Sequence, residues 1–501
     1  MTASSDAGVQ AIPAPPTPLT RAALSARARS PIHVPPVRIV HLGLGAFHRA
    51  HQAWYTAMAQ DAAGWGIAAF TGRTALAAQQ LAPQDGLYTL IERSDDGDSA
   101  SVILSIAEAV DGGDLRRFVQ LIAAPTTSIV TLTITEPGYR LTADGLPDQS
   151  DPAVVADVQW LAEALSTDAF SADAFSNDSL AASGPRTSLG RLLLGLDARR
   201  RARAGSIAVV PCDNVPDNGT FLRRGLTAFA EAVNADTAAW IANHVSFVST
   251  SVDRITPKTR PSDVATAAAL TGWADAAPVV TEPFTDWVLS GEFPAGRPAW
   301  ESAGARFVDD IGPFEQRKLW LLNGAHSLLA YAGSLRGHST VAAAIADTVC
   351  RDWVVALWDE DVRHLPTEGL DLDAYRAALL KRFENSRIEH HLSQIGMEGA
   401  TKLRVRVAAV ARAERAAGRS GEASARAIGA WIAALRAGFE FVDAQSAAIQ
   451  QELQSRSDGT GNDDGAARRL LGIVDADLAR DDEFVATVLA TVAEATAAAS
   501  V

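Results

Sequence analysis

Cysteine is almost absent from this chain of 501 residues, which contains only Cys212 and Cys350. Two cysteines so far apart in the sequence cannot build a disulfide framework, and they cannot supply a cysteine-based zinc site. The composition therefore favours a protein of the reducing cytoplasm.

Long hydrophobic runs and an excess of positive charge are also missing. No apolar run approaches the ~20 residues that a membrane-spanning helix requires, and the N-terminus lacks the apolar core of a signal peptide. The chain has 44 Lys and Arg against 59 Asp and Glu, for a formal net charge of -15. Such a surface repels nucleic acid and anionic lipid. The sequence thus predicts a soluble protein without a nucleic-acid or membrane partner.

What the sequence does have is an alternation of short β-rich runs with helical segments. Residues 1–36, rich in Ala, Pro, Ser and Thr, come first and are interpreted as an extended or wrapping arm with one short helix near Leu19–Arg29. The β-rich runs that follow are Ile39–Leu42, Trp65–Phe70, Leu87–Ile91, Ser128–Ile134 and Ser206–Val210. Alternating strands and helices predict a parallel sheet with helices on both faces.

The pattern changes after about Pro283, where we expect the strands to stop, and from Phe314 onward the apolar periodicity is helical. We therefore predict an α/β Rossmann-like domain with a mostly parallel sheet over residues 37–285. A mainly α-helical C-terminal domain that binds the substrate is predicted over residues 286–501.

The first predicted strand leads directly into Gly43-Leu44-Gly45, and we expect a helix to begin at Ala46 or Phe47. Glycines at a strand-to-helix turn let the backbone approach a pyrophosphate, which the helix N-terminus then stabilises. The third glycine of the usual dinucleotide fingerprint is missing, because His48 stands in its place. A tight turn that merely permits packing would also explain the glycines. Their position after the first strand of a strand–helix series favours a nucleotide site.

The residues after the second strand bear on the choice of cofactor. NAD-specific proteins carry an acidic residue there for the ribose 2′-hydroxyl. This chain has Phe70-Thr71-Gly72-Arg73 instead, and Arg73 is suited to a 2′-phosphate. Both NAD and NADP therefore stay open.

The segment Pro313–Ser327 is the most informative part of the sequence. Pro313 suits the first turn of a helix, and apolar residues lie almost all round it, as expected of a buried helix. With Lys318 at zero on a wheel of roughly 100° per residue, three polar side chains fall on one side at about 60°, 80° and 140°, namely Glu315, His326 and Asn323. The rise from Lys318 to His326 is roughly 12 Å, which leaves room for a six-carbon chain.

These residue types suit the oxidation of an alcohol. A lysine in a desolvated pocket loses proton affinity, so Lys318 can take a hydroxyl proton as hydride leaves the carbon. Asn323 can hydrogen-bond the developing oxygen, and His326 suits a neighbouring hydroxyl. Each residue alone could instead be a satisfied polar group on a structural helix. All of them on one side of an apolar helix favour a site.

Several blocks of this sequence occur in a known family in the same order. They are Val40–Gln52, Thr131–Tyr139, Cys212–Gly219, Val252–Pro257 and Lys318–Ser327. In these blocks the chain resembles the mannitol dehydrogenase family of long-chain polyol dehydrogenases, which includes mannitol 2-dehydrogenase and fructuronate reductase. The resemblance implies an NAD(P)-dependent, metal-independent oxidoreductase with some preference for NAD. Its substrate would be an open-chain sugar alcohol or sugar acid, such as mannitol or mannonate.

The resemblance also implies roles for single residues. Lys318 would be the general acid/base, Asn214 and Asn323 would hold the reacting oxygen, and His326 would bind the substrate. Glu315 would control proton exchange between Lys318 and solvent.

The second block of the resemblance brings two more residues to the expected cofactor site, Thr133 and Glu136. The position of Asn214 after the strand Ser206–Val210 agrees with its implied role, because ligands meet the ends of parallel strands. An Asp-Asn pair is also a common turn former.

The resemblance places substrate contacts less clearly outside these blocks. Asp253 and Arg254 follow a β-like run and could orient the substrate or Lys318, or could bridge the two domains. Of the cations in the helical part, we take Lys402 as the substrate-binding candidate beside Arg404 and Arg406.

Two other classes of protein were weighed. A zinc alcohol dehydrogenase needs a cluster of Cys, His and Glu ligands, whereas His390-His391 stand without an accompanying motif. A dinucleotide-binding sensor or scaffold without enzymatic activity is the alternative, because a fold alone does not fix function. The helix bearing Lys318 argues against it. No particular oligomeric state is predicted.

Overall fold

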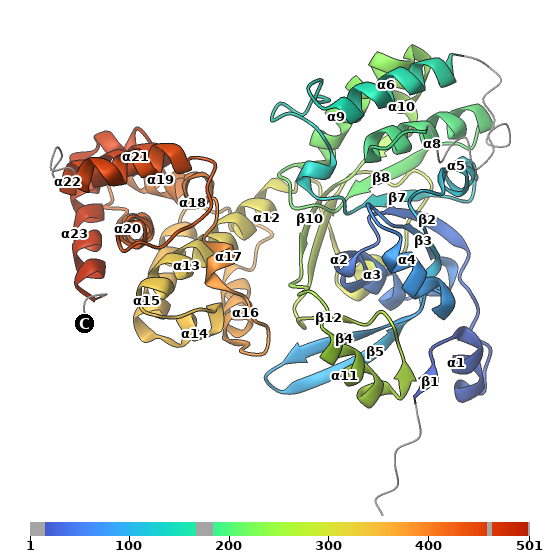
Figure 1. Cartoon of the computed structure of the whole chain (residues 1–501), viewed down its shortest axis with the longest axis horizontal. Coiled ribbons are helices and arrows are strands. Elements are labelled where there is room, and N and C mark those ends of the chain that lie inside the picture. Colours follow the sequence, from blue (N-terminus) through green and yellow to red (C-terminus); the bar gives the residue numbers. More distant parts are fainter. Residues whose placement is uncertain (1–15, 167–183, 458–462, 499–501) are drawn as a thin grey trace, which may run out of the picture. The chain divides into compact units, whose positions relative to one another are not determined.

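The computed structural model describes residues 16–166, 184–457 and 463–498, which form two compact units (Figure 1). Unit 1 comprises the chain up to Phe307 apart from two short segments, Arg93–Gly97 and Glu282–Phe284, which belong to unit 2 together with the chain from Val308. Residues 1–15 of the predicted arm lie outside the described part.

A six-stranded parallel sheet forms the centre of unit 1. In spatial order its strands are β6 (Ile106–Val110), β3 (Gly66–Phe70), β2 (Val37–Leu42), β7 (Ile129–Leu132), β8 (Ile207–Pro211) and β9 (Val245–Phe247). The strand order reverses between β2 and β7. In open parallel sheets ligands bind at the carboxyl ends of the strands at such a switch point. The predicted Rossmann-like sheet is confirmed.

The two faces of the sheet are covered by different helices because successive residues of a strand point to opposite faces. Val40 and Leu42 belong to one hydrophobic cluster, and Ile39 between them belongs to the other. Helices of the first cluster are α5 (Leu115–Ala123), α6 (Pro152–Leu165), α8 (Ser188–Ala202), α9 (Asn218–Val233) and α10 (Ala235–His244). The other face carries α2 (Ala46–Ala50) and α3 (Gln52–Met58), as Figure 1 shows.

Smaller strands complete unit 1. One sheet has the order β12-β4-β5, from Val279–Thr281, Tyr88–Ser94 and Gly97–Ile103, so the predicted strand Leu87–Ile91 exists but lies outside the main sheet. The arm begins with β1 (Thr17–Pro18), which pairs with β11 (Trp273–Ala274), and continues as the short helix α1 (Arg21–Ala28).

The expectation that strands stop after Pro283 is wrong. β13 (Asp286–Ser290) pairs antiparallel with β10 (Ser249–Asp253), and β14 (Arg306–Phe307) pairs with β13. The pairing buries Trp287, Val288 and Leu289 completely. Unit 1 therefore extends past the predicted division at residue 286.

Unit 2 is mainly helical, as predicted. Its helices are α12 (Gly312–Arg317), the π-helix η5 (Lys318–Gly324), α13 (Ala325–Leu335), α14 (Val341–Ala346), α15 (Thr348–Asp361), α16 (Leu372–Glu384), α17 (Leu392–Ile395), α18 (Gly399–Leu403), the π-helix η6 (Arg404–Ala408), α19 (Ala409–Ala416), α20 (Glu422–Arg436), α21 (Ser446–Ser457), α22 (Asp463–Val474) and α23 (Asp482–Ala498). The almost fully buried α20 packs against α13, α15 and α23.

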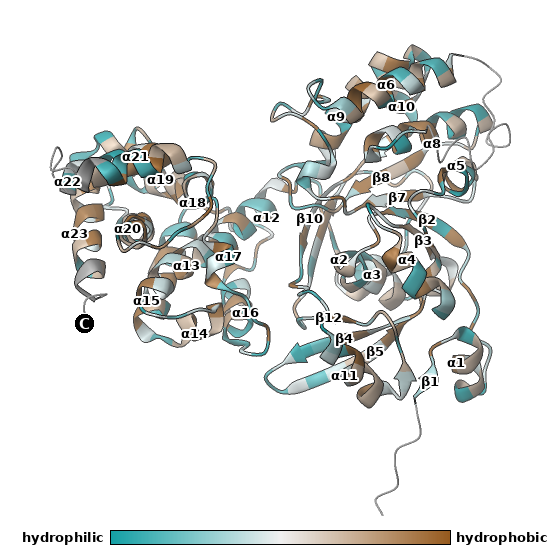
Figure 2. Cartoon of the chain, in the orientation of Figure 1, coloured by the Kyte–Doolittle hydropathy of each residue, from teal (hydrophilic) through white to brown (hydrophobic). Residues whose placement is uncertain are grey.

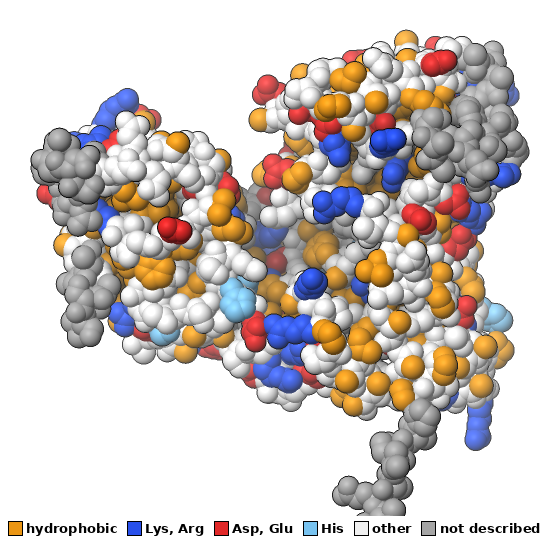
Figure 3. All heavy atoms as spheres, viewed as in Figure 1, with side chains coloured by type: hydrophobic (Ala, Val, Ile, Leu, Met, Phe, Trp, Pro, Cys, Tyr) orange, Lys and Arg blue, Asp and Glu red, His pale blue; other side chains and the backbone are white. Residues whose placement is uncertain are grey.

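Hydrophobic residues gather along particular elements of the fold, and many charged side chains lie on the surface. Hydrophobic residues run along β8 and α23 in Figure 2. On the face in Figure 3, acidic and basic side chains are scattered over both units. Within the described ranges, no helix is long and apolar enough to span a membrane.

Candidate functional site

The turn after β2 lies at the switch point of the sheet and requires glycine at its first position. Gly43 has a φ of 107°, and a Cβ there would lie 2.1 Å from the carbonyl oxygen of Thr133. Gly45 is extended and precedes α2, and a Cβ there would meet only the Gly43 carbonyl oxygen, in ordinary contact at 3.5 Å. The N-terminus of α2, where Ala46 and Phe47 stand, has no side-chain cap. Its first backbone amides are therefore not satisfied by a capping side chain, and α2 begins just after the carboxyl end of β2, where such sheets bind ligands.

A buried hydrogen-bond chain holds this turn to β7. The Thr133 hydroxyl donates to the Gly43 carbonyl oxygen at 2.9 Å, so it must accept from Nε2 of His41, 3.0 Å away. His41 Nδ1 then accepts from the hydroxyl of Thr131 at 2.8 Å. Burial lowers the pKa of His41 to about 3, which keeps the ring neutral and this tautomer in place. These hydrogen bonds join β2 to β7, the two strands on either side of the switch point.

His48 fills the position of the missing third glycine. Its ring is completely buried and lies flat on His41, with 3.4 Å between the ring centroids and 10° between the planes. Burial, and then the neighbouring His41, lower the pKa of His48 far below its usual range. The third glycine normally allows close helix–strand packing. In this chain a stacked pair of neutral imidazoles joins the helix to the strand instead.

The loop after β7 carries Glu136 and is organised by a residue that the sequence reasoning did not select. The carboxylate of Asp213 accepts hydrogen bonds from the amides of Ile134 (3.0 Å) and Thr135 (2.7 Å) and from the Tyr139 hydroxyl (2.8 Å). These bonds hold Thr135 at a φ of 65°, which is strained for a β-branched residue. Glu136 is exposed at the start of the next turn. The only signal for Asp213 was its place beside Asn214.

Asn214 and Arg73 both follow carboxyl ends of strands in the main sheet. Asn214 comes after β8 and is exposed. Arg73 comes after β3 and is also exposed, and Phe70-Thr71-Gly72-Arg73 includes no carboxylate. Both residues thus stand at the edge of the sheet where a cofactor is expected.

Asp253 and Arg254 are buried at the end of β10. The Arg254 guanidinium donates to the Ala50 carbonyl oxygen at 2.7 Å and to Oε1 of Glu92 at 2.5 Å. It also lies over the ring of Trp54, 4.7 Å from the centroid. These contacts lie within unit 1, where Arg254 joins the end of α2 to β4, and they test none of the roles predicted for it.

In unit 2, Glu315, Lys318, Asn323 and His326 lie on one continuous helical segment that is not α-helical throughout. Glu315 is on α12, Lys318 and Asn323 are on η5, and His326 is on α13. A π-helix has more residues per turn than an α-helix because its hydrogen bonds span five residues. The predicted wheel angles for Asn323 and His326 are therefore wrong, since they assumed an α-helix. Lys318 and Asn323 are half-buried.

His326 lies among cations of unit 2. It is 7% exposed, and its Nε2 is buried without a hydrogen-bond partner. Burial lowers its pKa far below the usual range, and the positive charge of His390, Arg382, Arg406 and Lys402 adds to this effect. An unpaired buried nitrogen is costly unless a ligand pairs with it.

The three candidate cations of the helical part have different partners. Arg404 donates to the carbonyl oxygens of Val474 (3.0 Å) and Ile473 (2.7 Å) at the end of α22. Arg406 donates to the carbonyl oxygen of Asn323. Lys402 is half-buried and donates to the Ile395 carbonyl oxygen at 3.0 Å; burial lowers its pKa to about 8. The one hydrogen bond of the Lys402 side chain occupies one of its three ammonium donors.

In the described part of the chain, no group of three or more His, Cys, Asp or Glu residues is arranged to hold a metal ion. His390 packs edge-on against His326, with ring centroids 4.8 Å apart.

Both units match known protein families. Residues 37–302 match the model of the mannitol dehydrogenase Rossmann domain, and residues 310–496 match that of the mannitol dehydrogenase C-terminal domain.

Individual proteins are similar over most of their length. Mannitol 2-dehydrogenase of Aspergillus fumigatus is 35% identical over 465 residues, covering 89% of this chain and 88% of the relative. D-mannonate oxidoreductase of Escherichia coli is 35% identical over 380 residues, 73% of each chain. The solved ternary complex of Pseudomonas fluorescens mannitol 2-dehydrogenase with NAD and D-mannitol aligns with a TM-score of 0.73 and 32% identity, over 93% of this chain and 94% of the other.

Proposed function

Because the chain belongs to the mannitol dehydrogenase family, we propose that it is an NAD(P)-dependent oxidoreductase of open-chain sugars. It interconverts a secondary alcohol of a hexitol or hexonate with the ketone, as in D-mannitol and D-fructose or D-mannonate and D-fructuronate. The observation that carries the proposal is the helical segment with Lys318 and Asn323, followed by the buried, unpartnered Nε2 of His326.

The turn at the switch point supports a dinucleotide. Its fit rests on Gly43, where a Cβ would collide with Thr133, and on the uncapped start of α2. Gly45, Ala46, Phe47, Thr133 and Glu136 are the further residues proposed to hold the cofactor. The nicotinamide supplies the hydride acceptor or donor. Arg73 would accept a 2′-phosphate, so NADP is expected to be used alongside NAD.

In the proposed chemistry, Lys318 takes the hydroxyl proton during oxidation and returns it during reduction. The amide of Asn323 hydrogen-bonds the reacting oxygen and stabilises the charge that develops there. Asn214 keeps the same role on the strength of its position in the sequence. Nε2 of His326 binds a neighbouring hydroxyl, and Glu315 passes protons between Lys318 and solvent.

Lys402 is proposed to bind the end of the substrate away from the reacting carbon, and Asp253 and Arg254 stay predicted substrate contacts. With its pKa near 8, Lys402 is mostly charged at neutral pH and suits a carboxylate as well as a hydroxyl. A panel of fructose, fructuronate and their reduced forms, each with NAD and with NADP, decides between hexitol and hexonate. The readout is the absorbance of reduced nicotinamide.

The proposed chemistry is tested by Lys318→Ala. Turnover should fall by about 10²-fold or more, within the range of general acid–base catalysis, while cofactor affinity hardly changes. In the wild type, oxidation should speed up and reduction slow down as the pH rises, because one proton on one group controls both. Lys381→Ala, on the exposed side of α16, is the matched control and should keep full turnover. Near-native turnover of Lys318→Ala would contradict the proposal.

A further inference from the structure

The seven-residue π-helix that bears Lys318 and Asn323 is an unusual element. It interrupts an otherwise α-helical segment between α12 and α13. Such segments are rare and mostly amount to a single turn inside an α-helix, so a longer one needs support from neighbouring groups. Two of its backbone carbonyls receive that support from side chains of other helices.

The first support comes from Trp358 on α15. Its side chain is fully buried, and its only donor, Nε1–H, bonds the Leu321 carbonyl oxygen at 2.7 Å. The indole also packs against the ring of Phe383, with centroids 6.2 Å apart. A buried indole with one hydrogen bond has a single orientation, so it fixes the carbonyl that it meets.

The second support comes from Arg406 on η6, the other π-helical segment of unit 2. One terminal nitrogen of its guanidinium donates to the Asn323 carbonyl oxygen and to the Ser327 hydroxyl oxygen, each at 3.1 Å. The two π-helices approach so closely that a Cβ on Gly324 would lie 3.4 Å from the Arg406 carbonyl oxygen. Burial lowers the pKa of Arg406 to about 10, which leaves it charged at neutral pH.

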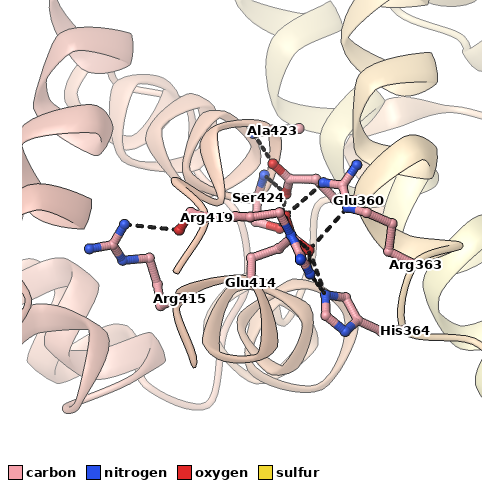
Figure 4. Close-up of polar contacts among 8 residues, drawn as sticks. All are labelled: Glu360, Arg363, His364, Glu414, Arg415, Arg419, Ala423 and Ser424. Carbon is pink, nitrogen blue, oxygen red and sulfur yellow. Dashed lines mark hydrogen bonds and ion pairs between the residues drawn. The ribbon is translucent and has the colours of Figure 1, made fainter. Parts of the chain in front are cut away.

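Trp358 stands on a helix whose end is itself anchored. The carboxylate of Glu360, two residues further on, accepts hydrogen bonds from the amides of Ala423 (2.8 Å) and Ser424 (2.9 Å) and from the Ser424 hydroxyl (2.7 Å), at the start of α20. Figure 4 shows this contact beside the ion pairs of Glu414. The indole is therefore held from a fixed point of the domain.

We propose that Trp358 and Arg406 are positioning residues that keep η5 in its π-helical form and so hold Lys318 and Asn323 in the register needed for catalysis. If η5 relaxed into an α-helix, Asn323 and His326 would rotate relative to Lys318, because the number of residues per turn would change. The inference rests on the proposed function of Lys318 and adds two residues that position this side chain.

The experiment compares Trp358→Phe, which keeps an aromatic ring but removes the N–H donor, with Trp353→Phe. Trp353 is on the same helix, half-buried, with the Arg426 guanidinium 5.3 Å from its ring centroid. Trp358→Phe should lower kcat about 10- to 100-fold, as expected for misplaced catalytic groups, with little change in cofactor Kd. The pH midpoint of oxidation should move, since Lys318 changes its surroundings. Trp353→Phe should match the wild type in all three.

Arg406→Lys provides the second variant, which keeps the charge but loses the planar set of donors, and it should lower kcat about 10-fold with a shifted pH midpoint. If circular dichroism shows that Trp358→Phe does not fold, Arg406→Lys alone tests the inference. Wild-type kcat in a folded variant would overturn the inference, and so would a lower kcat with an unmoved pH midpoint. Lys318→Ala in the same series separates the two proposals: if it too is fully active, the proposed function fails as well.

Discussion

At the switch point, residues of the same type differ in what their surroundings require of them. The two glycines of the turn are one example. Gly43 adopts a positive φ and stands against the Thr133 carbonyl, whereas Gly45 is extended and could hold a Cβ without a clash. The same contrast applies to the two histidines nearby. His41 holds the turn through Thr133, whereas the His48 ring contributes by stacking on the His41 ring.

Gly43→Ala and Gly45→Ala form a matched pair. Gly43→Ala should lower the Tm and weaken cofactor binding, because the positive φ alone costs about 1–2 kcal/mol and the new Cβ displaces the Thr133 backbone. Gly45→Ala should leave the Tm nearly unchanged, and any loss of cofactor affinity would then report close approach of the pyrophosphate. Thermal unfolding and cofactor titration measure both. A Gly43→Ala protein with native Tm and native affinity would show that the turn geometry is not required.

At the scale of elements, the ends of α15 and α19 are joined by ion pairs around one carboxylate. Glu414 is 1% exposed and contacts Arg363 at 2.6 Å, His364 at 2.5 Å and Arg419 at 2.7 Å (Figure 4). Burial by itself would raise the pKa of Glu414. The hydrogen bonds from these three residues outweigh burial and lower it to about 2.

Glu414→Gln should reduce the free energy of unfolding by about 2–3 kcal/mol, because it removes charge-assisted hydrogen bonds and leaves two arginines side by side. A carboxylate with a lowered pKa stabilises the fold fully above its ordinary value of 4.5 and loses this effect as the pH falls toward about 2. The wild type should thus lose stability over that range more steeply than the variant. Urea unfolding at several pH values is the measurement.

The control for Glu414→Gln is Glu422→Gln, whose carboxylate is 60% exposed and pairs with Arg426 on the surface of α20. It should cost at most about 0.5 kcal/mol. Equal losses in the two variants, or identical pH dependence of Glu414→Gln and wild type, would mean that the Glu414 cluster does not join these helices.

At the scale of the whole molecule, the chain combines a nucleotide-type sheet in one unit with a lysine-bearing helical segment in the other. Neither unit, in its described residues, presents a cluster of metal-ligating side chains. Lys318 is the side chain proposed to transfer the proton, and the proposed chemistry assigns no step to a metal ion.

Prolonged dialysis against a strong chelator should accordingly leave the rate of polyol or hexonate oxidation unchanged. The assay is turnover before and after dialysis, with and without added Zn²⁺. A loss of activity that zinc restores would contradict the proposed mechanism.

The sequence by itself determined the fold class and the position of the glycine turn at the switch point. Strand and helix periodicity and the Gly43-Leu44-Gly45 turn are local patterns, since they depend on residues close together in the chain. The family resemblance extended this to both units, and the family comparisons agree with it.

Only the tertiary structure decided the rest. β13 exists because it pairs with β10, the π-helix at Lys318 is held by Trp358 and Arg406, and Arg254 has its partners at Ala50 and Glu92. Asp213 organises the loop after β7 because its carboxylate accepts hydrogen bonds from the amides of Ile134 and Thr135. Each of these features depends on a partner distant in sequence. Hydrogen bonds between distant residues form only when the fold brings those residues together. Local sequence patterns therefore could not predict them.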